Sequence, residues 1–141
     1  MSQQFCTFHV DGHFFGVEVD KVQEVVRQQQ LTPVPLAPPE VSGLINLRGQ
    51  IVTTIDLRIR LGLPRRATGV DAMNVLMAGK DGVVSLQVDQ IGDVVDVDPA
   101  TIEAPPPTLG GNLRQFIRAV SKQQGRLLLV LDESRAMDLA A

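Results

Sequence analysis

The chain has 141 residues, which is enough for one domain of ordinary size or for two very small units that share a core. With 44% hydrophobic and 21% charged residues, it has the composition of a globular protein that buries a core. The formal net charge of −3 argues against nucleic-acid binders and polybasic membrane-surface proteins, and the absence of Trp and Tyr leaves few aromatic residues for base stacking.

Targeting and redox signals point to the cytoplasm. No apolar run approaches the roughly 20 residues that a membrane-spanning helix needs, and the N-terminus lacks the basic and apolar regions of a signal peptide. Cys6 is the only cysteine, so no intrachain disulfide can form. We therefore expect a cytoplasmic protein that does not insert into a membrane.

The first predicted element is a β-hairpin near the N-terminus. In residues 5–10, alternate side chains would point to opposite sides of a strand, and this alternation is typical of a half-buried strand. Asp11 and Gly12 form a turn signal, and residues 14–19 then read as the second strand.

A weak internal repeat runs through the chain. Two pairs of segments align, with offsets of 69 and 76 residues: 15–26 with 84–95, and 49–56 with 125–132. In the first pair the apolar positions coincide and Glu24 matches Asp93, whereas in the second a Gly opens a β-rich run and an Asp closes it. Pro-rich connectors at 33–39 and 105–107 interrupt the two copies at corresponding places. Such self-similarity predicts two related structural units.

Each copy contains several short strands broken by Gly and Pro, which favours small antiparallel β-barrels over a parallel sheet. A short helix is expected from Asp56 to Leu61, with Asp56 as N-cap and Gly62 beyond its end, and residues 132–137 form its counterpart. Residues 65–71 read as the linker between the copies. Because a barrel of about 60 residues is marginally stable alone, the two should pack together and form a groove at their seam.

The candidate metal-binding and nucleophilic residues have simpler interpretations. His9 and His13 are the only histidines, and their spacing on a hairpin does not supply the three or four ligands of a metal site. Cys6 faces away from His9 in an apolar strand, which indicates a core residue rather than a nucleophile. No cofactor is therefore expected.

Two segments resemble ligand-binding loops only superficially. The three aspartates within residues 93–98 lack the glycine and glutamate of a calcium loop, and residues 43–50 lack the spacing and the Lys-Ser/Thr of a phosphate loop. Gly49 is better explained by a tight hairpin turn that requires positive φ, and Gly125 is its counterpart in the second copy.

Arg48 is the residue of greatest interest. It is the only charged residue in the run 43–52, so its guanidinium is either paired or splayed into solvent at a turn. Glu24 is a candidate partner because both copies carry an acidic residue at this position. A partly buried Arg–carboxylate fork would orient a recognition surface more than it would stabilise the fold.

Ordered segments in both copies resemble the CheW family. In the first copy they are Phe15-Gly16-Val17, Val22-Gln23-Glu24-Val25, Gly43 to Gly49 and Ile55-Asp56-Leu57-Arg58. In the second copy they are Val88-Asp89, Asp93-Val94-Val95, Ile102 to Pro106 and Gly125 to Asp132. The likeness runs from about Phe5 to Met137, and Asn-Leu-Arg-Gly ahead of Ile-Asp-Leu-Arg is its most specific part.

The resemblance implies an all-β fold of two small five-stranded SH3-like β-barrels packed on a shared core, with short helices. It places one CheW-like domain at residues 1–141, with subdomains at about 12–66 and 72–137 and with the N-terminal strand, 3–10, able to cross over to the second barrel. It also implies a non-catalytic adaptor. One face would bind the cytoplasmic hairpin tip of methyl-accepting chemoreceptors, and others would bind the regulatory domain of a CheA-type histidine kinase.

Carried over to this sequence, the receptor-binding role falls on seven positions. These are Val22, Glu24, Gly43, Asn46, Arg48, Ile91 and Val94. The apolar members would line a groove that accepts a helical hairpin, with Arg48 and Glu24 as its polar pair. Kinase-binding residues are expected among exposed hydrophobic side chains at the outer barrel edges.

Two other classes stand as alternatives. A small β-barrel that binds nucleic acid would need basic grooves and stacking aromatics, which the composition disfavours. An enzyme would need a base–nucleophile pair or a set of metal ligands, and the sequence supports neither.

Overall fold

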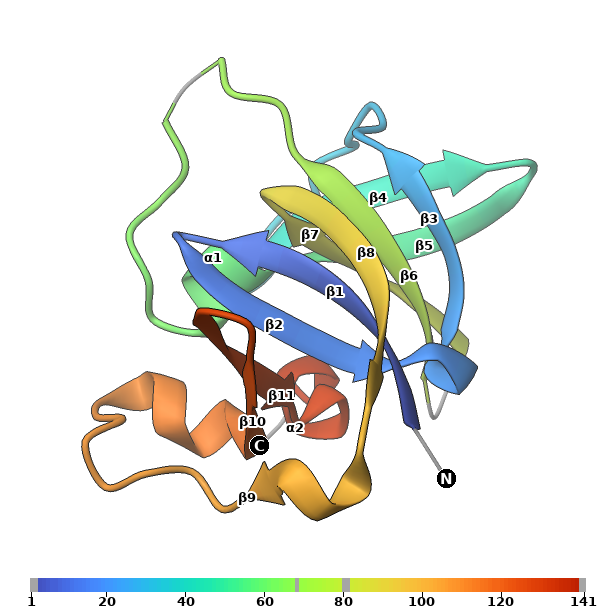
Figure 1. The fold of residues 1–141 in the computed structure, drawn as a ribbon. Coiled ribbons are helices and arrows are strands. Elements are labelled where there is room, and N and C mark those ends of the chain that lie inside the picture. The colour runs from blue at the N-terminus through green and yellow to red at the C-terminus, as the bar shows by residue number, and fades with distance from the viewer. Residues whose placement is uncertain (1–2, 68, 80–81, 140–141) are drawn as a thin grey trace.

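A computed structural model describes residues 3–67, 69–79 and 82–139 of the chain, whose strands form two sheets (Figure 1). The five-stranded sheet has the order β3 (Val22–Arg27), β6 (Met73–Gly79), β7 (Gly82–Val88), β5 (Gln50–Asp56), β4 (Val41–Leu47). The six-stranded sheet has the order β8 (Gln90–Val97), β1 (Gln3–Val10), β2 (His13–Glu18), β11 (Arg126–Leu131), β10 (Ile117–Gln123), β9 (Ile102–Glu103). The predicted all-β fold with short helices is confirmed.

The helices are one turn or little more in length. They are η1 (Val19–Lys21), α1 (Leu57–Arg60), η2 (Pro99–Thr101), η3 (Asn112–Phe116) and α2 (Glu133–Met137). Asp56 caps α1 by accepting a hydrogen bond from the Arg58 amide at 2.9 Å, and Asp132 caps α2 by accepting one from the Arg135 amide at 3.1 Å. The two capped helices predicted from the sequence are therefore confirmed.

Strand pairing confirms the internal repeat residue by residue. β5 pairs in parallel with β7, where Thr53 lies opposite Val84, and β11 pairs in parallel with β2, where Leu129 lies opposite Phe15. These are equivalent pairs, because the offset of 76 maps Thr53 onto Leu129 and the offset of 69 maps Phe15 onto Val84. The β-bulge in each copy also falls at the same aligned position, in β4 and in β10.

Each sheet combines strands of both copies. The hairpin β1–β2 lies with β8 to β11, and the equivalent hairpin β6–β7 lies with β3 to β5. The two sheets therefore interleave along the chain. The physical reason is that two copies with matching hydrophobic patterns can exchange equivalent hairpins without changing either pattern.

The buried apolar residues form two clusters, and the larger of them joins the two sheets. The larger contains fully buried residues of both sheets, such as Phe8 and Phe15 from one and Met77 and Leu86 from the other. The smaller one, which includes Phe14, lies on the opposite face of the six-stranded sheet. Because successive residues of a strand point to opposite faces, Phe14 and Phe15 belong to different clusters. The shared core predicted from the sequence is thus the larger cluster.

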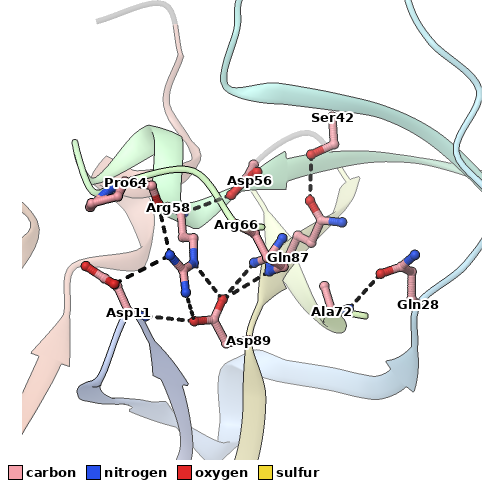
Figure 2. A network of polar contacts seen from close by, with 10 residues as sticks. All are labelled: Asp11, Gln28, Ser42, Asp56, Arg58, Pro64, Arg66, Ala72, Gln87 and Asp89. Carbon is pink, nitrogen blue, oxygen red and sulfur yellow. Dashed lines mark hydrogen bonds and ion pairs between the residues drawn. The ribbon is translucent and has the colours of Figure 1, made fainter. Parts of the chain in front are cut away.

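A polar network fixes the point at which the chain passes from β7 to β8, and thus from one sheet to the other (Figure 2). The Asp89 carboxylate accepts hydrogen bonds from Arg58 Nη2 at 2.6 Å, from Arg66 Nη2 at 2.9 Å and from the Asp11 amide at 2.8 Å. Burial by itself raises the pKa of Asp89, but these hydrogen bonds outweigh it and lower the pKa from 3.8 to about 2. The network therefore ties three other parts of the chain, at residues 11, 58 and 66, to one carboxylate.

The equivalent passage from β2 to β3 has its own ion pair. Lys21 in η1 donates to Glu133 Oε1 in α2 at 2.7 Å, and the Glu133 side chain is only 5% exposed. This hydrogen bond, together with the charge of Glu133, raises the pKa of Lys21. Each connection between the two sheets is thus tied to a helix by an ion pair. The β7–β8 connection is tied to α1, which follows β5, and the β2–β3 connection is tied to α2, which follows β11.

Candidate functional site

The β4–β5 hairpin determines where Arg48 lies. Arg48 and Gly49 are the two residues of the turn, and both have positive φ, 53° and 86°. This backbone conformation matches the twist of a two-residue hairpin, but it costs a residue with a side chain about 1–2 kcal/mol. Asn46 supports the turn because its side-chain oxygen accepts a hydrogen bond from the Gly49 amide at 3.0 Å. Gly125, in the β10–β11 turn, also has a positive φ of 73°.

Arg48 reaches from this turn to Glu24 in β3. Its Nη1 donates to Glu24 Oε1 at 3.0 Å, and its Nη2 donates to Glu24 Oε2. Because β3 and β4 are the two edges of the five-stranded sheet, this two-pronged contact helps to close the sheet into a barrel. The hydrogen bonds from Arg48 lower the pKa of Glu24, and those to Glu24 raise the pKa of Arg48.

The side chains of Arg48 and Glu24 bond to each other and are also exposed to solvent. The Arg48 side chain is 67% exposed and that of Glu24 is 29% exposed. Solvent screens such a pair, so it adds little to stability. The sequence left open whether Arg48 is paired or solvated, and the structure shows that it is both. A fixed charge at the surface is suited to recognition by another molecule.

Gly43 lies beside a backbone link between β4 and Thr32, in the segment that follows β3. Thr32 and Leu44 exchange backbone hydrogen bonds at 2.8 Å in each direction. Gly43 is buried, its φ is 149°, and a Cβ at this position would lie 2.6 Å from the backbone oxygen of Thr32. The backbone contact therefore explains why this position is a glycine.

We expect Gly43→Ala to lower the free energy of unfolding by roughly 2 kcal/mol, because the new methyl group meets a backbone oxygen and the φ value disfavours any side chain. Gly110→Ala is the matched control, since a Cβ there meets nothing within 4 Å. Urea unfolding followed by circular dichroism compares the two variants. Equal unfolding midpoints would contradict this account of Gly43.

The apolar members of the predicted set lie on two edge strands. Val22 in β3 and Ile91 in β8 occupy equivalent positions, and both are partly buried against the shared core. Val94, also in β8, is 55% exposed. The structure thus gathers Glu24, Asn46 and Arg48 at one end of the five-stranded barrel and places Ile91 and Val94 on the edge of the other sheet.

Two cavities lie away from these residues. One, of about 730 Å³, lies between the β6–β7 hairpin and α2 and is bordered by Lys21, Glu133 and Met137. The other, of about 360 Å³, is bordered by Arg60, Phe116 and Arg135. Neither contains a residue of the predicted receptor-binding set, so the apolar groove expected at the seam is not one of these two cavities.

Cys6 and His9 both lie in β1 of the six-stranded sheet. Cys6 lies in β1 and packs partly buried against the shared core, where burial raises the pKa of its thiol and keeps it protonated at neutral pH. His9 packs against Phe14, with 5.3 Å between ring centres. Within residues 3–67, 69–79 and 82–139, no group of three or more His, Cys, Asp or Glu side chains could hold a metal ion.

The charged network around Asp89 was not predicted from the sequence. Arg58 and Asp89 both lie in segments that carry the family likeness, yet they are 31 residues apart. Nothing in the spacing of the two residues shows that they pair, because the contact depends on which β-hairpin joins which sheet. One signal in the sequence could have drawn attention to Asp89. In the aligned repeat, it lies at the point where the second copy passes from β7 to β8.

A family model described as the CheW-like domain matches residues 4–141. The chain belongs to the CheW family. It is 32% identical to the chemotaxis protein CheW of Bacillus subtilis over 136 residues, which cover 96% of this chain and 87% of that protein. It is 30% identical to the protein FrzA of Myxococcus xanthus over 119 residues, which cover 78% of this chain and 68% of that protein.

A solved structure agrees with this assignment. The scaffolding protein TtCheW from Thermoanaerobacter tengcongensis superposes with a TM-score of 0.88 at 26% identity, covering 99% of this chain and 94% of that one. Two SH3-like barrels are consistent with this match. As a member of the CheW family, the chain is a chemotaxis adaptor, and the family does not favour the nucleic-acid alternative. No helix in the described part of the chain is long and apolar enough to cross a membrane.

Proposed function

We propose that this CheW-family chain catalyses no reaction and joins chemoreceptors to a CheA-type histidine kinase at the cytoplasmic face of a receptor array. The exposed Arg48–Glu24 fork is the observation that supports the receptor side of this proposal. It presents a fixed charge pattern at the end of a rigid β-barrel. A surface of this kind selects a protein partner by charge and shape.

The receptor partner would be the helical hairpin at the cytoplasmic tip of a methyl-accepting receptor. Its apolar side chains would pack against Val94 and against the exposed edges of Val22 and Ile91, burying surface worth roughly 25 cal/mol per Å². Its polar groups would bind Arg48 and Glu24. Because Asn46 and Glu24 already hold the arginine and its turn in place, less conformational entropy is lost on binding.

The kinase partner would bind apolar residues at the outer barrel edges. Ile51 in β5 is 59% exposed, and Leu127 in β11 is 36% exposed. The offset of 76 makes these two residues equivalent, so each barrel presents a large apolar side chain at the same place. We propose that the regulatory domain of the kinase binds at these positions.

A pull-down with a receptor cytoplasmic fragment and a kinase regulatory domain, offered separately and together, tests this function. We expect the chain to retain each partner alone and to link them when both are present. Ile51→Asp should weaken retention of the kinase domain and leave that of the receptor fragment unchanged. If the folded wild-type chain retains neither partner, the proposal is wrong.

A further inference from the structure

The five-stranded barrel has polar side chains in its interior. Ile55, Met77 and Leu86 of this sheet point into the shared core, so the residues that alternate with them point the other way, into the barrel. That inner face contains the fully buried Ile45 and Val52. Four buried polar residues lie on the same face: Thr54, Asn74, Ser85 and Gln87.

Three of these side chains have buried atoms without a partner. Thr54 Oγ1, Asn74 Oδ1 and Ser85 Oγ make no hydrogen bond to any residue that the structure describes. Thr54 and Ser85 are 0% exposed and Asn74 is 1% exposed, so bulk solvent does not reach them. Buried polar groups in folded proteins are nearly always bonded, either to protein or to ordered water.

Strand register brings these groups to one place. Thr54 in β5 lies opposite Ser85 in β7, and Asn74 in β6 lies opposite Gln87 in β7. Since Ser85 and Gln87 are two residues apart, all four side chains leave the sheet on the same side. Neighbouring strands are about 4.8 Å apart, a distance that one water molecule can bridge with hydrogen bonds of about 2.8 Å.

The other barrel shows that the fold does not require polar groups here. The positions equivalent to Thr54 and Asn74 are Val130 and Phe5, which belong to the smaller apolar cluster. The position equivalent to Ser85 is Gly16, where an added Cβ would lie 2.9 Å from Leu128 Cδ1. At these three positions the other barrel thus has two apolar side chains and a glycine.

We propose that the five-stranded barrel contains a buried hydration site. At least one long-lived water molecule binds Thr54 Oγ1 and Ser85 Oγ, and a water O–H donates to Asn74 Oδ1. Because Asn74 lies two strands away from Thr54, the water that binds Thr54 Oγ1 and the water that binds Asn74 Oδ1 are counted separately. This site is inside the barrel whose edges carry the Arg48–Glu24 fork, and it is distinct from the receptor-binding surface.

Water relaxation dispersion in solution counts long-lived waters, and NOE cross-peaks between water and the amides of residues 54 and 85 locate them. We expect the wild-type chain to show both signals. In the double variant Thr54→Val, Ser85→Ala, we expect the cross-peaks to vanish and the dispersion to fall by at least one water. Both changes remove a hydroxyl with little change in side-chain volume.

Ser121→Ala is the matched control. Ser121 is also buried, but its hydroxyl is already bonded to Thr101 at 3.1 Å and to Gln123 at 3.0 Å, so this variant should keep the signals at residues 54 and 85. Absence of a water signal at these two residues in the folded wild-type chain would overturn the proposal, whether or not the double variant folds. Persistence of the signal in a folded double variant would overturn it as well.

Discussion

Arg48→Glu should weaken binding of a receptor cytoplasmic fragment by about tenfold to a hundredfold, which corresponds to about 1.4–2.8 kcal/mol. The substitution replaces the exposed guanidinium with a carboxylate and sets it against Glu24 in β3. Two like charges then repel at the place where the fork was formed. Binding isotherms of the wild-type chain and the variant, measured at the same salt concentration, give the ratio.

The barrel itself should stay folded in this variant. The Arg48 side chain is 67% exposed, so its ion pair adds little to stability, and the backbone link between Leu44 of β4 and Thr32, in the segment that follows β3, is unaffected. A circular dichroism spectrum and an unfolding midpoint close to those of the wild-type chain would show this.

Arg27→Glu is the matched control for the change in charge. Arg27 is exposed at the end of β3, the strand that carries Glu24, and its substitution alters the net charge by the same amount. We expect this variant to bind the receptor fragment nearly as well as the wild-type chain. Undiminished binding by a folded Arg48→Glu chain, or an equal loss in both variants, would count against the proposed site.

The variant Asp89→Asn should lower the free energy of unfolding by about 2–3 kcal/mol at pH 6. The Asp89 side chain is 18% exposed and accepts hydrogen bonds from two arginines and one backbone amide. Hydrogen bonds to charged groups contribute about 1.5–3 kcal/mol, and the variant would also leave Arg58 and Arg66 without their carboxylate. Because the chain has no Trp or Tyr, circular dichroism is the suitable probe for urea unfolding.

The loss in this variant should depend on pH. The pKa of Asp89 is about 2 in the folded chain and 3.8 as its ordinary value, so the unfolded chain binds this proton more readily. The stability that ionised Asp89 provides is therefore complete above about pH 4 and disappears as the pH falls through 2. We expect the difference between the wild-type chain and Asp89→Asn to narrow steadily from pH 4 downwards.

Asp96→Asn provides the comparison for this pH series. Asp96 is an exposed carboxylate in β8, and its substitution removes the same charge from the chain without touching the network around Asp89. We expect it to change the unfolding midpoint little at pH 6. A difference between the wild-type chain and Asp89→Asn that stays constant from pH 6 to pH 2.5 would show that the charge of Asp89 is not what stabilises the passage from β7 to β8.

Much of the local structure was determined by the sequence. Alternation predicted the β1–β2 hairpin and capping predicted α1 and α2, because each depends on residues that are neighbours in the chain. The repeat predicted two related units because both copies carry the same hydrophobic pattern. Glu24 could be named as the candidate partner of Arg48 because both copies carry an acidic residue at its position. Whether Arg48 pairs with it or stays solvated was left open by the sequence, and the structure shows the pair.

The tertiary structure decided the contacts that depend on how the two copies of the repeat pack together. The hydrophobic patterns of the equivalent hairpins are compatible with either sheet. The pairing of β2 with β11 and of β7 with β5 therefore follows only from packing of the shared core. The contact between Arg58 and Asp89 and the polar interior around Thr54 follow from that exchange. The sequence thus determined the individual strands and helices and the similarity of the two copies. The burial of both copies in one core decided which strands pair and which charged side chains contact each other.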